Sequence, residues 1–365
     1  MKERLPLQAL IGALAAEQLI DGAAADRGRE LTGQMYAIQP WYVRTMVGFG
    51  AWLASLLLVG FIASFGFAVE GSHVVIGLAL AAGSVFLRRR YETDFYVQSA
   101  LAVSLAGQLM FALGVAELLD WDQPEAIVLA MLSLAALMFV AFPDRIHRVL
   151  MVLIVSGSFV VLVYLWKFNW LVPVLGPFFA AALVVLQSTQ GSWYEADRGG
   201  LVRPLQSGLM LSSFGCLLLS AVYILPELHL RFVFYPRPWI STLLLGALLL
   251  YVAGDAWRSL LAADSKTGRI TVYALLVGIA AAAWAAPGIL LALVVALLGA
   301  RSGNHVLAGA GVVFLAVFLA AFFYGIETTL LVKSMTLVAT GIVILVARWL
   351  MLRSLFPSSG GLHDA

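Results

Sequence analysis

The sequence predicts an all-α integral membrane protein with about twelve transmembrane helices and a short helical hairpin at the N-terminus. Three observations lead to this prediction. Apolar stretches close to membrane-spanning length recur from Arg44 almost to the C-terminal tail. Charged residues make up 12% of the chain, well below the share in soluble domains, and the mean hydropathy is +0.97. A bilayer favours helices because they satisfy their backbone hydrogen bonds within one segment.

Residues 1–40 are expected to form a cytoplasmic amphipathic helical hairpin. Asp21 is placed to cap a second short helix over Ala23–Leu31, which charged residues keep in contact with water. The first helix has an apolar face, formed by Leu7, Leu10, Ile11 and Leu14 at helical spacing.

The predicted spans then follow in order, separated by short polar connectors. A bilayer core needs about 20 helical residues, so the second and tenth spans are short. We expect that flanking residues extend them, that the bilayer is thinner around them, or that they are partly re-entrant. The spans are Arg44–Phe67, Ser72–Leu87, Phe95–Leu119, Glu125–Phe142, Val149–Trp166, Trp170–Leu186, Leu205–Leu225, Trp239–Ala253, Ile270–Trp284, Pro287–Leu298, Val306–Tyr324 and Thr328–Ala347.

The longest inner connector, residues 187–204, divides the spans into two sets of six, within residues 41–186 and 205–349. Residues 350–365 form a cytoplasmic tail. A division into six plus six resembles transporters built from two halves. No motif recurs through the two halves, however, and the connector Arg88–Asp94 lacks the major-facilitator signature of Gly and Asp followed by basic residues and Gly.

Charge placement predicts that both termini are cytoplasmic. With this orientation every Lys and Arg lies on the inner side except Lys167, Arg231, Arg237 and Lys333, while acidic residues collect on the outer side. Tryptophans such as Trp121 and Trp284 fall at the predicted outer boundary, as expected of a headgroup belt.

No Asp, Glu, His, Lys or Arg lies at the centre of a predicted span, which argues against proton coupling and against a carboxylate pair. Uncharged groups are the remaining candidates. Ser104 and Gln108 share one helix face with Gln98 nearby, and with Lys333 they form a candidate polar cavity or packing face. A second group of small residues repeats every fourth position and predicts close helix packing: Gly208, Ser212, Cys216 and Ser220.

Other chemistries lack support in the sequence. His73 and His229 lie on separate short loops, which does not indicate a metal site, and His147 and His305 are interpreted as interfacial. Cys216 is the only cysteine. No phosphate loop, nucleophile elbow or basic face for nucleic acid is visible, so we expect no enzyme activity, no cofactor, no metal and no nucleic-acid partner.

The outer segment Pro226–Pro238 is unusual because prolines bracket alternating apolar and polar residues. Such a segment either lies in the membrane interface or docks another protein.

Three groups of residues stand out: Leu19-Ile20-Asp21, then Pro40–Arg44 leading into Gly48, Gly50, Trp52 and Gly60, and the basic connector followed by Phe95, Gln98, Leu105, Ala106, Gly107 and Gln108. Together they resemble an uncharacterised bacterial multi-pass membrane family, DUF4401, a domain of unknown function. This resemblance implies a location in the inner membrane of a bacterium. The resemblance implies, as partner, a membrane-anchored protein with a Gly-Asp-Tyr motif. This chain has no such motif, since Gly254-Asp255 is followed by Ala256. It brings no established activity or site.

Two functions therefore remain open. The first is a non-catalytic membrane subunit or scaffold that holds a partner protein in the lipid bilayer, supported by the family context and the outer segment. The second is a permease for a small or amphipathic solute, supported by the number and grouping of the spans and by the uncharged polar faces.

Overall fold

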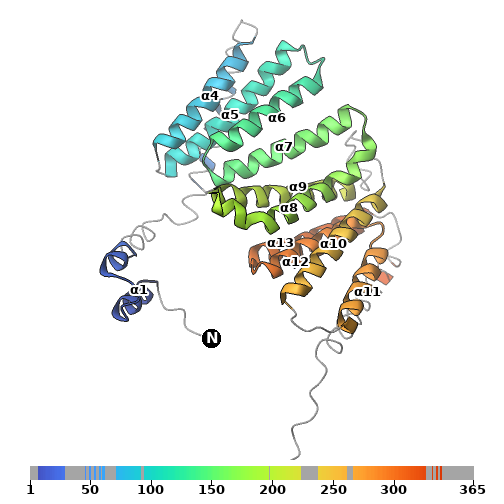
Figure 1. Ribbon diagram of the computed structural model, residues 1–365. Helices are drawn as coiled ribbons and strands as arrows, with labels where there is room; N and C mark the ends of the chain where they lie inside the picture. The colour runs from blue at the N-terminus through green and yellow to red at the C-terminus, as the bar shows by residue number, and fades with distance from the viewer. Residues whose placement is uncertain are drawn as a thin grey trace, which may run out of the picture. The chain divides into compact units, whose positions relative to one another are not determined.

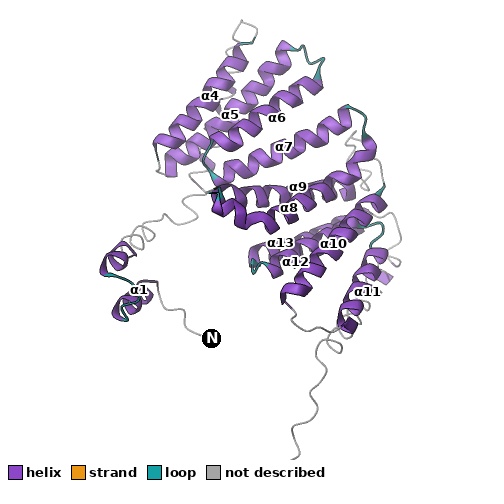
Figure 2. Cartoon of the chain, in the orientation of Figure 1, coloured by secondary structure: helices purple, strands orange, loops and turns teal. Residues whose placement is uncertain are grey.

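The computed structural model describes residues 7–28, 71–91, 94–196, 198–222, 237–260 and 266–325, with isolated positions between 46 and 61 and between 331 and 338. Every regular element in these residues is helical, as Figure 2 shows. The all-α prediction is therefore confirmed for the described part of the chain.

Seven of the described helices are long and apolar enough to cross a membrane, which indicates a membrane protein. They lie within α4 (Ser72–Arg90), α5 (Asp94–Leu118), α6 (Pro124–Ala141), α7 (Arg145–Leu165), α8 (Val172–Glu195), α10 (Pro238–Leu260) and α13 (His305–Gly325), labelled in Figure 1. The other long elements are α9 (Gly199–Val222), α11 (Lys266–Ala282) and α12 (Pro287–Arg301). The first and last predicted spans lie outside the described residues apart from isolated positions, so the count of about twelve is not confirmed.

The two spans that were predicted to be short differ in length. α4 continues to Arg90 and has 19 residues, so it is long enough to cross. α12 has 15 residues, or about 22 Å of helix, which is less than the thickness of a hydrocarbon core.

The chain divides into two compact units, residues 1–69 with 76–110 and residues 70–75 with 111–365. In the first unit, α1 (Leu7–Ala16) precedes a short helix over residues 22–28. The Asp21 carboxylate accepts a hydrogen bond from the Ala24 N–H at 2.6 Å and caps that helix. The same unit contains a close helix contact, because a Cβ added at Gly107 of α5 would lie 2.8 Å from the Gly77 carbonyl oxygen of α4.

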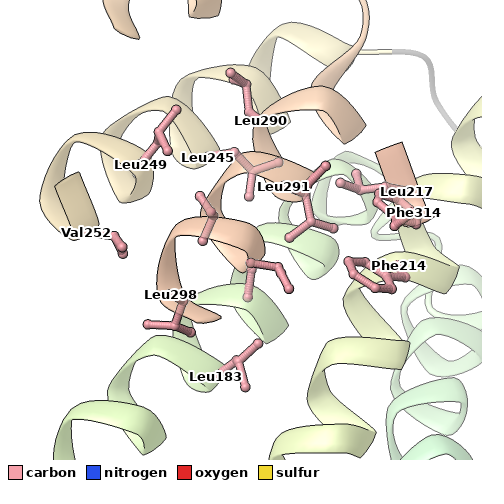
Figure 3. Close-up of a cluster of buried hydrophobic side chains, with 14 of the residues drawn as sticks. Leu183, Phe214, Leu217, Leu245, Leu249, Val252, Leu290, Leu291, Leu298 and Phe314 are labelled. Atoms are coloured by element: carbon pink, nitrogen blue, oxygen red, sulfur yellow. The ribbon is translucent and has the colours of Figure 1, made fainter. Parts of the chain in front are cut away.

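In the second unit, α9 contacts α7, α8, α12 and α13, while α10 contacts α8, α11 and α12. An apolar cluster fills the space between these helices (Figure 3). Within this cluster the rings of Phe214 on α9 and Phe314 on α13 stack with centroids 4.0 Å apart. Other buried members are Leu183 on α8, Leu245 and Leu249 on α10, and Leu290, Leu291 and Leu298 on α12. Burial of this cluster orders the helices around α9.

Small residues allow α12 and α13 to lie against each other. A Cβ added at Gly311 of α13 would lie 2.7 Å from the Ala296 backbone nitrogen of α12. A Cβ at Gly299 would be closer still to the backbone of Ala308. Van der Waals contact of this kind is the main source of helix association in lipid.

Helix continues through most of the predicted connector 187–204. α8 runs to Glu195 and α9 begins at Gly199, so only a short turn separates the two helices, as Figure 2 shows. The predicted connector is longer than the observed gap between the helices because hydropathy locates only the end of an apolar run. A helix continues for as long as its backbone hydrogen bonds are satisfied. Whether residues 187–204 lie outside the membrane stays a prediction.

Candidate functional site

The continuation of α8 and α9 past their apolar runs places polar side chains on two helix faces. On α8, Gln187, Gln190 and Tyr194 follow one another at spacings of three and four residues, so they lie on one face. On α9, Gln206 and Ser207 follow Arg203 by three and four residues, and Met210 follows them by four and three, so these four residues also share a face.

These two faces line a cavity of about 580 Å³, which we call the basic cavity. Arg145 of the first turn of α7 lines it as well, together with the turn that joins α12 to α13 and the start of α13. The described residues that line it are Arg145, Gln187, Gln190, Tyr194, Arg203, Gln206, Ser207, Met210 and residues 302–307. A volume of this size is within the range of sites that bind small molecules.

The charge of the basic cavity has one sign. Arg145 and Arg203 line it, whereas no Asp or Glu is found among the lining residues that the structure describes. His305 adds an imidazole, and glutamine, serine and asparagine side chains supply neutral hydrogen-bonding groups. Such a lining favours an anion over a cation.

The two cavity arginines differ from two nearby arginines that have partners. The Arg148 Nε donates to the Phe139 carbonyl oxygen at 3.1 Å, and its Nη1 lies 3.5 Å from the Gly200 carbonyl oxygen. Arg301 forms an ion pair with Asp255. Arg145 and Arg203 are exposed, and within the described part of the chain neither side chain has a hydrogen-bonding or ion-pairing partner.

Neutral contacts fix the shape of the cavity. The Gln206 Nε2 donates to the Gln187 Oε1 at 2.5 Å and so joins α9 to α8. The Asn304 side chain accepts from the backbone N–H groups of Val306 and Leu307, both at 3.2 Å, and caps α13. Because that helix terminus is already capped, ligand recognition would fall to the side chains.

The inner wall of the cavity is apolar. Leu307 belongs to the apolar cluster of Figure 3, and Met210 packs against it. The exposed side of the cavity carries Arg145, Arg203, Asn304 and His305. The basic cavity is thus exposed where these polar residues lie, and it is bounded elsewhere by the packed side chains of Leu307 and Met210.

The residues predicted as a polar face lie elsewhere. Ser104 and Gln108 are buried on α5, where the Gln108 Nε2 donates to the Ser104 Oγ at 3.3 Å, and Gln98 is half-buried on the same helix. None of the three lines the basic cavity. Lys333 lies outside the described residues. Their role as a cavity or packing face stays a prediction.

The small residues predicted on the seventh span face two neighbours. A Cβ added at Gly208 would lie 2.5 Å from the Val152 Cβ of α7, and the Ser212 hydroxyl lies 2.6 Å from the Ser156 hydroxyl of the same helix. Cys216 is half-buried, and a Cβ added at Gly176 of α8 would lie 3.5 Å from its Cβ. The side chain of Ser220 lies outside the described residues.

The predicted spans place His147 in an inner connector, and this is wrong; its position at the membrane interface stays a prediction. His147 lies in the first turn of α7 and is fully buried, with its ring stacked on Phe142 at a centroid distance of 4.1 Å. The reason is the start of α7: the Asp144 carboxylate accepts from the Ile146 and His147 N–H groups, so the helix begins four residues before the predicted Val149.

The contact of His73 was not foreseen. Its Nδ1 lies 2.6 Å from the Glu117 Oε2 at the start of α4 and the end of α5. No group of three or more metal-ligating side chains occurs among the described residues. The pair therefore provides a link between two helix ends.

The basic cavity itself was missed by the sequence analysis. Its arginines were counted as part of the charge bias. Gln187 and Gln190 were assigned to the connector, whereas Gln206 falls inside the predicted seventh span. The signal that identifies them is the helical spacing from Gln187 to Tyr194 and from Arg203 to Met210, across the predicted ends of the two spans.

Comparison with known proteins adds one finding. No curated protein and no solved structure matches the chain. A family described as "Domain of unknown function (DUF4401)" matches residues 40–354, which confirms the resemblance seen in the sequence. The chain belongs to the DUF4401 family, whose function its name leaves open.

Proposed function

We propose that this protein is a permease of the bacterial inner membrane, with about twelve spans and both termini in the cytoplasm, that takes a small or amphipathic solute into the basic cavity. In the topology predicted from the charge bias, the exposed side of this cavity faces the cytoplasm. The proposal assigns no catalytic step, cofactor or metal to the chain.

The observation that carries the proposal is the basic cavity itself, whose exposed side carries Arg145 and Arg203. Its polar lining extends from Arg145 to the turn after α12, and its apolar lining residues Leu307 and Met210 pack with the cluster that contains Phe214 and Phe314. A concave site that combines apolar side chains with a few hydrogen-bonding and charged groups is typical of sites for small solutes.

The alternative is a scaffold that holds a membrane-anchored partner. The segment that favoured it in the sequence, Pro226–Pro238, lies almost entirely outside the described residues, so the structure adds nothing to its support. The two proposals differ in what binds: a solute for the permease, a protein for the scaffold.

A thermal-shift screen of the purified full-length protein in mild detergent, against water-soluble metabolites and short-chain lipids, tests the proposal. A compound that raises the Tm is then followed for uptake into proteoliposomes. Ser207→Phe should fill the cavity and abolish both effects, because Ser207 lines it. The matched control is Ser188→Phe, since Ser188 is exposed on α8 and does not line the cavity.

Two results would contradict the permease. One is the absence of any Tm shift across the screen while a membrane-anchored protein co-purifies in stoichiometric amount, which is the result expected of a scaffold. The other is uptake that survives Ser207→Phe unchanged.

A further inference from the structure

We propose that the ligand of the basic cavity is a phosphate-bearing anion, held by the guanidinium groups of Arg145 and Arg203. This inference rests on the proposed function for its biological meaning, but the binding site stands on the geometry of the cavity alone. The shared chemistry is the phosphate group, whether it belongs to a soluble phosphate ester or to an anionic lipid headgroup.

The first argument is charge. Two arginines line one cavity of about 580 Å³, and its described lining contains no carboxylate. Neither has a protein partner within the described part of the chain, whereas Arg148 and Arg301 beside them are engaged. Two guanidinium groups in one cavity repel each other, and this repulsion costs free energy. An anion of charge near −2 between them removes that cost.

The second argument is the arrangement of the donors. The arginines come from α7 and α9 and Gln190 comes from α8, so donors approach from three elements. A single carboxylate is planar and is satisfied by one arginine fork, whereas a phosphate presents several acceptor oxygens in three dimensions. Donors on several sides therefore match a phosphate better.

The third argument is the depth of the site. The cavity lies at the ends of apolar helices, and its apolar lining is limited to a few side chains such as Met210 and Leu307. Such a cavity accommodates a lipid headgroup or a small phosphate ester. The acyl chains of a bound lipid would lie outside it, in the bilayer.

The test uses the full-length protein, purified in mild detergent and stripped of bound lipid. Tm is measured against inorganic phosphate, glycerol 3-phosphate, short-chain phosphatidylglycerol and two controls, succinate and short-chain phosphatidylcholine. Wild type is compared with Arg145→Gln and Arg203→Gln. The matched control is Arg198→Gln, which removes an exposed arginine from the α8–α9 turn that does not line the cavity.

Phosphate-bearing anions should raise the Tm of wild type and of Arg198→Gln, and each cavity substitution should weaken binding by about tenfold or more. A response to glycerol 3-phosphate identifies a soluble ligand, and a response to phosphatidylglycerol alone identifies a lipid. The inference is overturned if no phosphate-bearing probe binds, if succinate binds as well as phosphate, or if Arg198→Gln loses as much affinity as the cavity substitutions. If another solute binds in a way that Ser207→Phe abolishes, only the phosphate inference fails; if nothing binds, the proposed function fails with it.

Discussion

The Ser156 and Ser212 hydroxyl oxygens lie 2.6 Å apart across the contact between α7 and α9. Each hydroxyl also lies within hydrogen-bonding distance of a carbonyl oxygen of its own helix, at Leu153 and Gly208. One turn earlier on α9, Gly208 faces Val152. A serine pair and a glycine thus allow the two helix backbones to approach closely, as is common where helices associate in lipid.

Gly208→Ala should destabilise the protein, whereas Gly215→Ala on the same helix should not. A Cβ at position 208 would overlap Val152, and overpacking typically costs about 1–3 kcal/mol. Position 215 has no atom within 4 Å of an added Cβ, so alanine there gains only its higher helix propensity. Thermal melts in detergent measure both. Equal melting temperatures for the two variants would contradict the prediction, because they would show that Gly208 is not in a tightly packed contact with Val152.

Gln108→Leu should lower the Tm without weakening ligand binding in the basic cavity. Gln108 is buried on α5, and its side-chain amide donates to the Ser104 hydroxyl. Loss of a hydrogen bond between such groups in a membrane protein costs about 0.6–2 kcal/mol. Leu109→Met, at an exposed neighbouring position, serves as the control. A ligand response that disappears in Gln108→Leu at unchanged Tm would instead assign Gln108 to the solute pathway.

The positions of most helices were predictable because a membrane helix needs a long apolar run, and such runs are visible in one sequence. α5, predicted over Phe95–Leu119, spans Asp94–Leu118, and α6, predicted over Glu125–Phe142, spans Pro124–Ala141. Errors are larger where a helix continues into polar sequence. α7 begins at Arg145 because Asp144 caps it, and α8 continues to Glu195 although its apolar run ends near Leu186.

The basic cavity was not predictable from hydropathy for a related reason. Charge bias treats Arg145, Arg148 and Arg203 alike, as inner-side cations. Only the packing of α6, α7 and α9 distinguishes them, because it brings the Phe139 carbonyl oxygen to Arg148 and leaves the other two without a partner in the described residues. These differences depend on tertiary contacts, which one sequence without relatives does not reveal.

The proposed orientation predicts which positions react from outside a sealed cell. In a Cys216→Ser background, Asp122→Cys and Lys167→Cys should react with a membrane-impermeant maleimide, because both lie in exposed turns at the predicted outer side. Ser192→Cys, exposed near the end of α8, should react only after the cells are opened. Reaction of Ser192→Cys in sealed cells would reverse the topology and place the opening of the basic cavity outside.

Substitution of either partner in the ion pair between Asp255 and Arg301 should change ligand affinity, in opposite directions for the two residues. Arg301 ends α12 directly before Ser302, which lines the basic cavity, and Asp255 on α10 offsets its charge. Asp255→Asn should therefore tighten binding of a phosphate-bearing anion, since a positive charge beside the cavity loses its counter-charge. Arg301→Gln should weaken binding, because it leaves a carboxylate nearby.

The double variant Asp255→Asn/Arg301→Gln should return to near the wild-type affinity, since it restores the net charge of the pair. Each single effect should be smaller than that of Arg203→Gln and should shrink as salt is raised, because both groups are partly exposed. Isothermal titration calorimetry with glycerol 3-phosphate or short-chain phosphatidylglycerol, whichever binds, at two salt concentrations measures these differences. Changes of the same sign in both single variants would show that the pair acts on the cavity through helix packing instead of through its charge.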